Sequence, residues 1–299
     1  MDDQSPSPII VSASYKTDIP AFYGPWFEGR LDAGFAMVAN PYGGPAQHVP
    51  LDAGSVAGFV FWTRNAAPFD PVLRRLADEC RPFIVQYTIT GYPRPLDAAT
   101  IGVDAAAAQV RRLAADYGPR AVVWRYDPIV VSTLTPPAWH RRTFATLADA
   151  IAGATDEVVV SLAQIYRKTA RNLNTAAQQH GFEWTDPADE EKRALLADLA
   201  AIAEDAGLRF SLCGQREYLI ETVDDARCID AERLADVAGR PMPAARRAHR
   251  RGCGCWSSKD IGAYDTCPHG CTYCYAVSSM AVAKRRFRSH DTSAAFLNA

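Results

Sequence analysis

A chain of 299 residues, 48% of them hydrophobic, is long enough to bury one large α/β core, or such a core with a small appendage. Its formal net charge of −2 gives no reason to expect strong electrostatic attraction to nucleic acid. The first residues are acidic and lack the basic-then-apolar pattern of a signal peptide, and no apolar run reaches the roughly 18–20 residues of a membrane-spanning helix. We therefore expect a cytoplasmic protein with no membrane partner.

Short runs of β-branched and aromatic residues alternate with helical patterns along most of the chain, which is typical of βα units around a parallel sheet. Several runs are apolar almost throughout, as expected for strands that are covered on both faces. The predicted strands are Ile9–Ala13, Phe35–Ala39, Phe59–Thr63, Phe83–Thr88, Ala121–Tyr126, Val158–Leu162 and Arg209–Cys213. The predicted helices between them include Asp70–Cys80, Asp104–Tyr117, Ala138–Ala152 and Pro187–Ala206.

Two further regions complete the predicted order of elements. The stretch between residues 41 and 54 carries turn signals, Gly43-Gly44-Pro45, and no helical pattern. An eighth strand is predicted near Lys259–Gly262 and a last helix over Val277–Arg286. Seven or eight such strands suit a (β/α) barrel, complete or open on one side, whose chemistry lies at the carboxyl ends of the strands.

The predicted barrel body covers residues 1–213. Residues 214–258 are the best candidate for a small cysteine-containing insertion, and their basic run, Arg246–Arg251, is predicted to be an exposed arm. Residues 259–299 are predicted to return to the barrel and close it. We therefore expect one structural domain overall.

Seven of the eight cysteines lie after residue 212. In a reducing compartment, clustered cysteines favour metal sites over disulfides. Cys80 stands apart at the end of a predicted helix and is expected to be an ordinary semi-buried thiol. The metal-binding prediction therefore concerns the C-terminal third of the chain.

The run Cys267-Pro268-His269-Gly270-Cys271-Thr272-Tyr273-Cys274 places three thiols at the spacing C-x3-C-x2-C. A loop this short can wrap three sulfurs around one metal centre. A closed zinc site normally needs four protein ligands, whereas a [4Fe–4S] cluster held by three keeps one iron open. The alternative is a zinc site completed by His269 or by a distant cysteine, but His269 is too close to its neighbours in sequence to share their metal easily. Cys267, Cys271 and Cys274 are therefore predicted to bind a [4Fe–4S] cluster.

Cys213, Cys228, Cys253 and Cys255 form a second set. A Cys-Gly-Cys pair can bind through both thiols, because glycine lets the backbone turn tightly. Two further cysteines would complete a four-thiolate shell for zinc or for a second iron–sulfur cluster. The alternative is that Cys213 and Cys228 are core residues and that the Cys253-Gly254-Cys255 pair lies loose near the first cluster.

The C-terminal loop resembles the cluster loop of the radical S-adenosylmethionine (SAM) enzymes, and most closely that of the spore photoproduct lyase-like proteins. In these enzymes the open iron chelates the amino and carboxylate groups of SAM. Tyr273 matches the aromatic residue that such loops place before their third cysteine. In the radical SAM enzymes the motif lies early in the catalytic barrel, whereas here Cys274 lies 25 residues from the end of the chain.

The chain as a whole resembles DUF1848, a bacterial family of unknown function whose C-terminal cysteines look like the radical SAM cluster motif. The segments that carry this resemblance are Ile10–Tyr23, Val60–Asn65, Tyr87–Tyr92, Trp124–Pro128 and Asp260–Cys267. Together they imply a circularly permuted radical SAM barrel. The strand, cluster loop and helix that normally come first would stand at the end of the chain, which is topologically feasible where termini lie close together.

Polar side chains accompany the predicted strands at the ends where a barrel would place its site. Ser12, Thr17 and Asp18 follow or end the first strand, and Arg125 and Asp127 end the fifth. At a barrel mouth they could hold the ribose and carboxylate of SAM, with Tyr273, and a polar substrate. Each also has a simpler interpretation as a helix cap or turn residue. Other residues at predicted strand ends are Trp62, Thr63, Asn65, Thr88, Thr90, Gln164 and Tyr166.

The resemblance implies an enzyme that binds a [4Fe–4S] cluster and SAM, cleaves SAM homolytically to a 5′-deoxyadenosyl radical, and receives electrons from a donor such as flavodoxin or ferredoxin. The first predicted strand lacks the Gly-Gly-Glu-like segment that helps such enzymes hold the SAM amino group. Two alternatives therefore stay open. One is a nucleic-acid lesion-repair or modification enzyme of the photoproduct-lyase kind, for which the basic runs Arg246–Arg251 and Lys284–Arg288 could contact phosphates. The other is a non-catalytic iron–sulfur or zinc protein, acting as a redox sensor or electron carrier.

Overall fold

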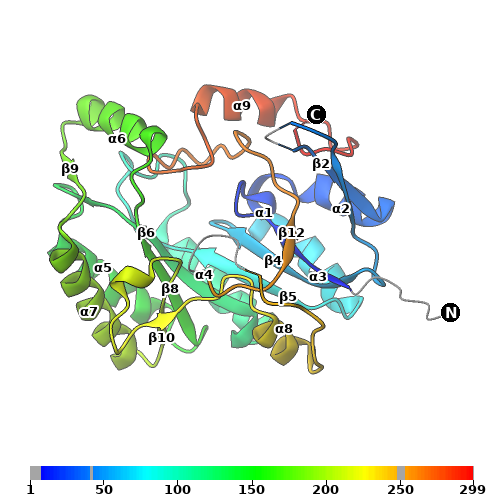
Figure 1. Cartoon of the computed structure of the whole chain (residues 1–299), viewed down its shortest axis with the longest axis horizontal. Coiled ribbons are helices and arrows are strands. Elements are labelled where there is room, and N and C mark those ends of the chain that lie inside the picture. Colours follow the sequence, from blue (N-terminus) through cyan, green and yellow to red (C-terminus); the bar gives the residue numbers. More distant parts are fainter. Residues whose placement is uncertain (1–7, 41–42, 248–252, 299) are drawn as a thin grey trace.

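The computed structural model describes residues 8–40, 43–247 and 253–298. Within these ranges the fold is built on an eight-stranded parallel sheet, with the order β11-β10-β8-β6-β5-β4-β1-β12. Figure 1 shows that the first and last of these strands along the chain, β1 and β12, lie side by side. The strands are β1 (Ile9–Ala13), β4 (Val56–Thr63), β5 (Phe83–Thr88), β6 (Val122–Ile129), β8 (Glu157–Leu162), β10 (Arg209–Leu212), β11 (Asp224–Asp225) and β12 (Ser258–Asp260).

Helices and short elements connect these strands. The α-helices are α1 (Ile19–Phe22), α2 (Gly24–Ala33), α3 (Asp70–Asp78), α4 (Val103–Tyr117), α5 (Pro137–Ala150), α6 (Arg167–His180), α7 (Asp189–Asp205), α8 (Ala231–Ala238) and α9 (Met280–Arg288). Short 3-10 turns are η1 (Ala67–Phe69), η2 (Pro119–Ala121) and η3 (Arg216–Tyr218). Two small antiparallel pairs lie outside the main sheet: β2 (Phe35–Val38) with β3 (Gln47–Pro50), and β7 (Val131–Ser132) with β9 (Trp184–Thr185).

The two faces of the sheet pack against different layers, because successive strand residues point to opposite sides. On β4, Phe59 and Phe61 join the large core that includes apolar residues of α2, α3, α4, α5 and α7. The alternate residue Val60 joins a second cluster, formed with α8 and the segment that follows it. Both faces are therefore covered, which accounts for the nearly continuous apolar runs in the strands.

Helix α8 packs closely against the sheet at Gly58 on β4. A side-chain carbon at Gly58 would lie 3.0 Å from Leu234 of α8 and 3.1 Å from the carbonyl oxygen of Pro82. A glycine at this position therefore allows the helix to approach the strand. Helix α8 consequently covers one face of the sheet near the amino ends of β4, β5 and β8.

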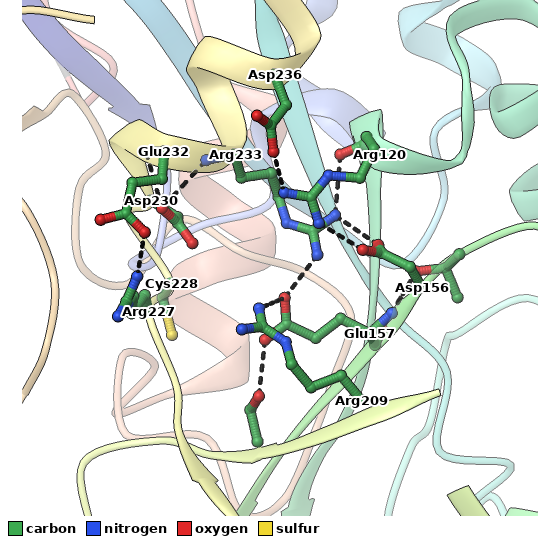
Figure 2. A network of polar contacts seen from close by, with 12 residues as sticks. Arg120, Asp156, Glu157, Arg209, Arg227, Cys228, Asp230, Glu232, Arg233 and Asp236 are labelled. Atoms are coloured by element: carbon green, nitrogen blue, oxygen red, sulfur yellow. Dashed lines mark hydrogen bonds and ion pairs between the residues drawn. The ribbon is translucent and has the colours of Figure 1, made fainter. Parts of the chain in front are cut away.

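A buried network of ion pairs fixes α8 at this position (Figure 2). Arg233, which is only 1% exposed, pairs through Nη2 with Oε2 of Glu157 at 2.7 Å and through Nη1 with Oδ1 of Asp156 at 2.8 Å. Glu157 also accepts hydrogen bonds from Arg209 and Ser211. Because buried charges are costly unless paired and hydrogen-bonded, this network locks α8 to the start of β8 and β10.

Most of the predicted strands form as expected, and β1 and β5 have the predicted bounds. The strand predicted near Lys259–Gly262 also forms, as β12, and it pairs in parallel with β1. The strand predicted at Phe35–Ala39 was wrongly placed in the main sheet. It forms β2, which pairs with β3 from the stretch predicted as turns only, and β4 takes the position beside β1. A local hairpin partner thus replaces the expected sheet neighbour.

Three other expectations need correction or limits. Cys80 is exposed rather than semi-buried, because it lies beyond the end of α3 with a left-handed backbone, φ 54°. Barrel closure is not seen: β11 and β12 are the two edges of the sheet within the described ranges. The arm predicted at residues 246–251 lies mostly outside the described residues. Among those described, no helix is long and apolar enough to cross a membrane.

Candidate metal and cofactor cavity

A cavity of about 330 Å³ opens where the strands of the main sheet reach their carboxyl ends. Parallel strands bring these ends to the same edge, so residues distant in sequence meet there. The wall includes residues that follow or end β1, β4, β5, β6, β8 and β10, and it includes the segment between β12 and α9. We name the run from Cys267 to Cys274 in that segment the cluster loop.

Seven of the eight cysteines line this cavity. Cys267, Cys271 and Cys274 belong to the cluster loop and are each half-buried. The other four are Cys213, Cys228, Cys253 and Cys255, which we name the four-cysteine group. The structure therefore brings both predicted cysteine sets to one cavity and leaves only Cys80 outside its wall.

Tyr273 anchors the cluster loop through a buried polar network. Its hydroxyl donates to Oδ1 of Asp97 at 2.6 Å and accepts a hydrogen bond from Nη2 of Arg64, also at 2.6 Å. Asp97 is nearly fully buried and also pairs with Nη1 of Arg64 at 2.7 Å and accepts from Thr90. Tyr273 is thus held between the loop after β4 and the loop after β5. This gives the residue a positioning role for the loop, in addition to its place in the cavity wall.

Asp18 anchors the loop at a second point, through His269. Nε2 of His269 lies 2.7 Å from Oδ2 of Asp18, and that oxygen also accepts the backbone N–H of Arg64 at 2.8 Å. The other carboxylate oxygen of Asp18 caps α1 by accepting the backbone N–H of Ala21. These bonds hold the Asp18 carboxylate in place. Asp18 therefore caps a helix, as one interpretation of the sequence expects, and it also lines the cavity.

Gly270 lets the cluster loop pack against the segment that follows β5. Its φ of +79° lies in the left-handed region, and a side-chain carbon there would lie 3.0 Å from Cβ of Ala98. Backbone hydrogen bonds from Ala99 to His269 and from Thr272 to Leu96 join the same two segments. Glycine is therefore required both for the backbone conformation and for the close approach.

We expect Gly270→Ala to destabilise the protein more than the matched change Gly181→Ala. Gly181 has a similar φ of +68° but nothing within 4 Å of an added carbon, so its replacement costs only the left-handed strain, about 1–2 kcal/mol. At Gly270 the displacement of Ala98 adds about 1 kcal/mol or more. Denaturant unfolding of the metal-free proteins measures both. Equal losses would mean that the loop does not pack on Ala98 as described.

Burial controls the state of the loop thiols. It raises the pKa of Cys267 to about 12 and raises the pKa values of Cys271 and Cys274 above that of an ordinary thiol. Asp18 adds to the effect at Cys267 and Asp97 at Cys271. Backbone N–H groups oppose it by pointing at the sulfurs of Cys267 and Cys274. Metal ligation needs thiolates, so a metal that binds the loop has to displace these protons.

Within the described residues, no group of three or more histidine, cysteine, aspartate or glutamate side chains is arranged to hold a single metal ion. An iron–sulfur cube does not require that arrangement. Each cysteine thiolate then binds its own iron at a separate corner, so the sulfurs stand further apart than around one ion. The donor set of the cluster loop, three thiolates on one short loop, fits such a cube.

The other predicted cofactor-binding residues differ in whether they line the cavity and in whether their polar atoms already have hydrogen-bond partners. Thr17 lines the cavity, and its buried Oγ1 has no hydrogen-bond partner within the described residues. Arg125 and Asp127 also line the cavity but pair with each other, from Nε to Oδ1 at 3.0 Å and from Nη2 to Oδ2 at 2.5 Å. Ser12 is fully buried outside the cavity wall and donates to Asp260 at 2.8 Å.

Four further polar residues at this end of the sheet were not among the predicted ligands. Lys16 lines the cavity and pairs with Asp260 at the end of β12. Arg64 lines it from the loop after β4, with Asp97 behind it. Arg64 and Lys16 follow closely after the ends of β4 and β1, so their place at the cavity could have been predicted from the sequence. Asp97 lies in an irregular segment nine residues after Thr88, and the sequence carries no sign that this segment folds onto the cluster loop.

Comparison with known proteins gives one match. The family model "Domain of unknown function (DUF1848)" matches residues 10–276, nearly the whole chain. The matched range includes the cluster loop and the four-cysteine group. No curated protein and no solved structure matches the chain. The match over nearly the whole length shows that the chain belongs to the DUF1848 family.

Proposed function

We propose that this protein is a radical SAM-type enzyme whose cluster loop holds a [4Fe–4S] cluster and SAM in the cavity at the carboxyl ends of the strands. The observation that carries the proposal is that the cluster loop and the carboxyl ends of the strands line the same cavity. Three thiols suited to one cluster face the same cavity as polar residues from six parallel strands. Its substrate enters that cavity, and a cytoplasmic one-electron donor such as flavodoxin or ferredoxin supplies the electron.

The order of the strands supports the permuted arrangement. The cluster loop follows β12, and β12 lies beside β1 in the sheet although the two are at opposite ends of the chain. Read from β12 onward, the sequence of elements is strand, cluster loop, helix α9 and then β1, β4, β5, β6, β8 and β10 in neighbouring order. This is the order that a radical SAM barrel would show if its first unit had moved to the end of the chain.

Two buried polar atoms at the cavity wall support a bound polar ligand. Oγ1 of Thr17 and Nδ1 of His269 have no hydrogen-bond partner within the described residues. Buried polar atoms in folded proteins almost always have a partner, so each is expected to meet a ligand or water here. Both are close to the predicted cluster ligands. His269 belongs to the cluster loop, and Thr17 is next in sequence to Asp18, which is hydrogen-bonded to His269. These atoms mark the wall where SAM would be held.

When bound and reduced by one electron, such a cluster supplies the homolytic cleavage of SAM. The contribution of this chain is binding, orientation and exclusion of water. Tyr273 and His269, fixed by Asp97 and Asp18, set the position of the loop. Arg125 and Asp127 form a rigid polar surface on the cavity wall against which a substrate would be oriented.

The proposal is tested by incubating anaerobically reconstituted protein with SAM and dithionite. We expect 5′-deoxyadenosine to form, slowly without substrate and faster with it. A fully loaded, reduced protein that forms none, with or without candidate substrates, would contradict the proposal. Salt-sensitive binding to DNA or RNA would indicate a nucleic-acid substrate. A cluster whose spectrum does not change when SAM is added would favour an electron carrier or redox sensor.

Thr17→Val is expected to weaken SAM binding about tenfold. Valine keeps the shape of threonine but removes the hydroxyl, and one hydrogen bond of this kind contributes about 1–1.5 kcal/mol. Thr169→Val is the matched control, because the hydroxyl of Thr169 is also buried without a partner but does not line the cavity. The dissociation constant of SAM, measured by equilibrium binding, should change in the first variant alone. The same change in both would remove Thr17 from the site.

A further inference from the structure

The four cysteines outside the cluster loop converge from three separate segments. Cys213 follows β10, Cys228 lies between β11 and α8, and Cys253 and Cys255 precede β12. Sγ of Cys213 lies 3.2 Å from Sγ of Cys228. Cys255 is buried in the same apolar cluster as Cys228, and Cys213 and Cys253 pack against that cluster. The four cysteines therefore gather at one apolar cluster in the cavity wall.

Ordinary core packing does not account for this arrangement. Cys228 and Cys255 are buried in the apolar cluster between α8 and the sheet, whereas Cys213 and Cys253 are only half-buried. Core cysteines usually behave as isolated small apolar residues. Here four cysteines gather at one cluster and also line a cavity, and none of the eight cysteines is in a disulfide.

Two of the four sulfurs accept hydrogen bonds from nitrogen donors. Nη1 of Arg125 donates to Sγ of Cys228 at 3.1 Å and to Oε1 of Gln86 at 3.2 Å. The backbone N–H of Ile229 donates to Sγ of Cys255 at 3.4 Å. Hydrogen bonds to sulfur are the outer contacts by which metal–thiolate centres orient their ligands and offset their negative charge. Arg125 therefore contacts a sulfur of the four-cysteine group in addition to pairing with Asp127.

We propose that Cys213, Cys228, Cys253 and Cys255 bind a second metal centre, separate from the cluster loop, through four thiolates. A four-thiolate shell takes an iron–sulfur cluster, whose irons bind one thiolate each, or zinc, for which the four side chains would have to close around one ion. Because its ligands all come from the protein, this centre has no open position for SAM or a substrate. In the iron form it can pass electrons to the cluster loop across the shared cavity, and in the zinc form it braces the segment that covers the sheet. The proposal does not depend on SAM chemistry at the loop.

The test separates the two centres by substitution. In Cys271→Ala, anaerobically reconstituted, the second centre should remain, with about one zinc or about four irons per chain that elemental analysis distinguishes. If that metal is iron, the spectrum of the reduced protein should not change when SAM is added. The double change Cys253→Ser and Cys255→Ser should lose this metal and keep the loop cluster. Cys80→Ala, which alters a cysteine outside the cavity, should keep both centres.

A second readout keeps the test decisive if the double variant does not fold. In Cys271→Ala, the alkylation rates of Cys213 and Cys253 are compared by mass spectrometry before and after metal removal by a chelator. We expect protection by at least tenfold in the loaded protein. Equal rates, or a Cys271→Ala protein with neither zinc nor iron, would overturn the proposal. A loop that binds no SAM beside a loaded second centre would leave this inference standing and contradict the proposed function only.

Discussion

Cys271→Ala should abolish SAM cleavage while leaving the fold intact. The loop offers only three thiols, so losing one leaves a cluster with two protein ligands. Changing even an outer contact of a metal ligand typically costs 10–100-fold in metal affinity or activity, and losing a ligand should cost more than about 100-fold. The expected result is 5′-deoxyadenosine at background level and a loss of about four irons per chain.

The matched control for this prediction is Cys80→Ala. Cys80 is exposed and lies outside the cavity wall, so its loss should change neither iron content nor SAM cleavage. Unfolding of the metal-free proteins should be the same for both variants within about 1 kcal/mol. If Cys271→Ala still cleaved SAM at the rate of the unaltered protein, the cluster loop could not be the reacting centre.

Arg233→Met should give the largest loss of stability expected on the sheet face covered by α8. Removing one partner of a buried ion pair costs about 3–5 kcal/mol, because the remaining charge is left uncompensated. Glu157 keeps Arg209 and Ser211 as partners, so we expect about 3 kcal/mol, at the low end of that range. Figure 2 shows how the guanidinium of Arg233 lies among the two carboxylates. Denaturant unfolding of the metal-free protein measures the effect.

Two further variants define the origin of that loss. Arg120→Ala removes pairs with Asp156 and Asp236 that are about 40–57% exposed, so it should cost only about 0–1 kcal/mol. Adding Glu157→Gln to Arg233→Met should cost less stability than Glu157→Gln costs alone, because the pair between Arg233 and Glu157 has already been lost. If Arg233→Met and Arg120→Ala cost the same, the network does not fix α8 in the way described.

Most of the main sheet could be predicted from the sequence because its strands are buried on both faces. Runs such as Phe83–Thr88 are apolar nearly throughout and end at polar residues, so both type and bounds were predicted. Phe35–Val38 is also apolar but pairs locally with β3. Composition identifies a strand, and it does not identify its neighbour. β11 is two aspartates, Asp224–Asp225, whose pairing depends wholly on the position of β10.

The candidate site was predictable where its residues are adjacent in the sequence. Cys267, Cys271 and Cys274 lie on one loop, so their spacing alone predicts a shared centre. The four-cysteine group spans residues 213 to 255, and its convergence depends on how the chain crosses the sheet face. The anchoring of Tyr273 by Asp97 depends on contact between two irregular segments, for which no periodic pattern exists.

The most direct test of the central claim is electron paramagnetic resonance of anaerobically reconstituted, dithionite-reduced protein before and after addition of SAM. The open iron of a three-thiolate cluster is the feature that distinguishes the cluster loop from a complete four-thiolate centre. We predict a [4Fe–4S]+ signal whose shape changes with SAM in the unaltered protein, and no SAM-dependent change in Cys271→Ala. Reduced protein that contains zinc at the loop, or a cluster signal that SAM leaves unchanged, would contradict the account.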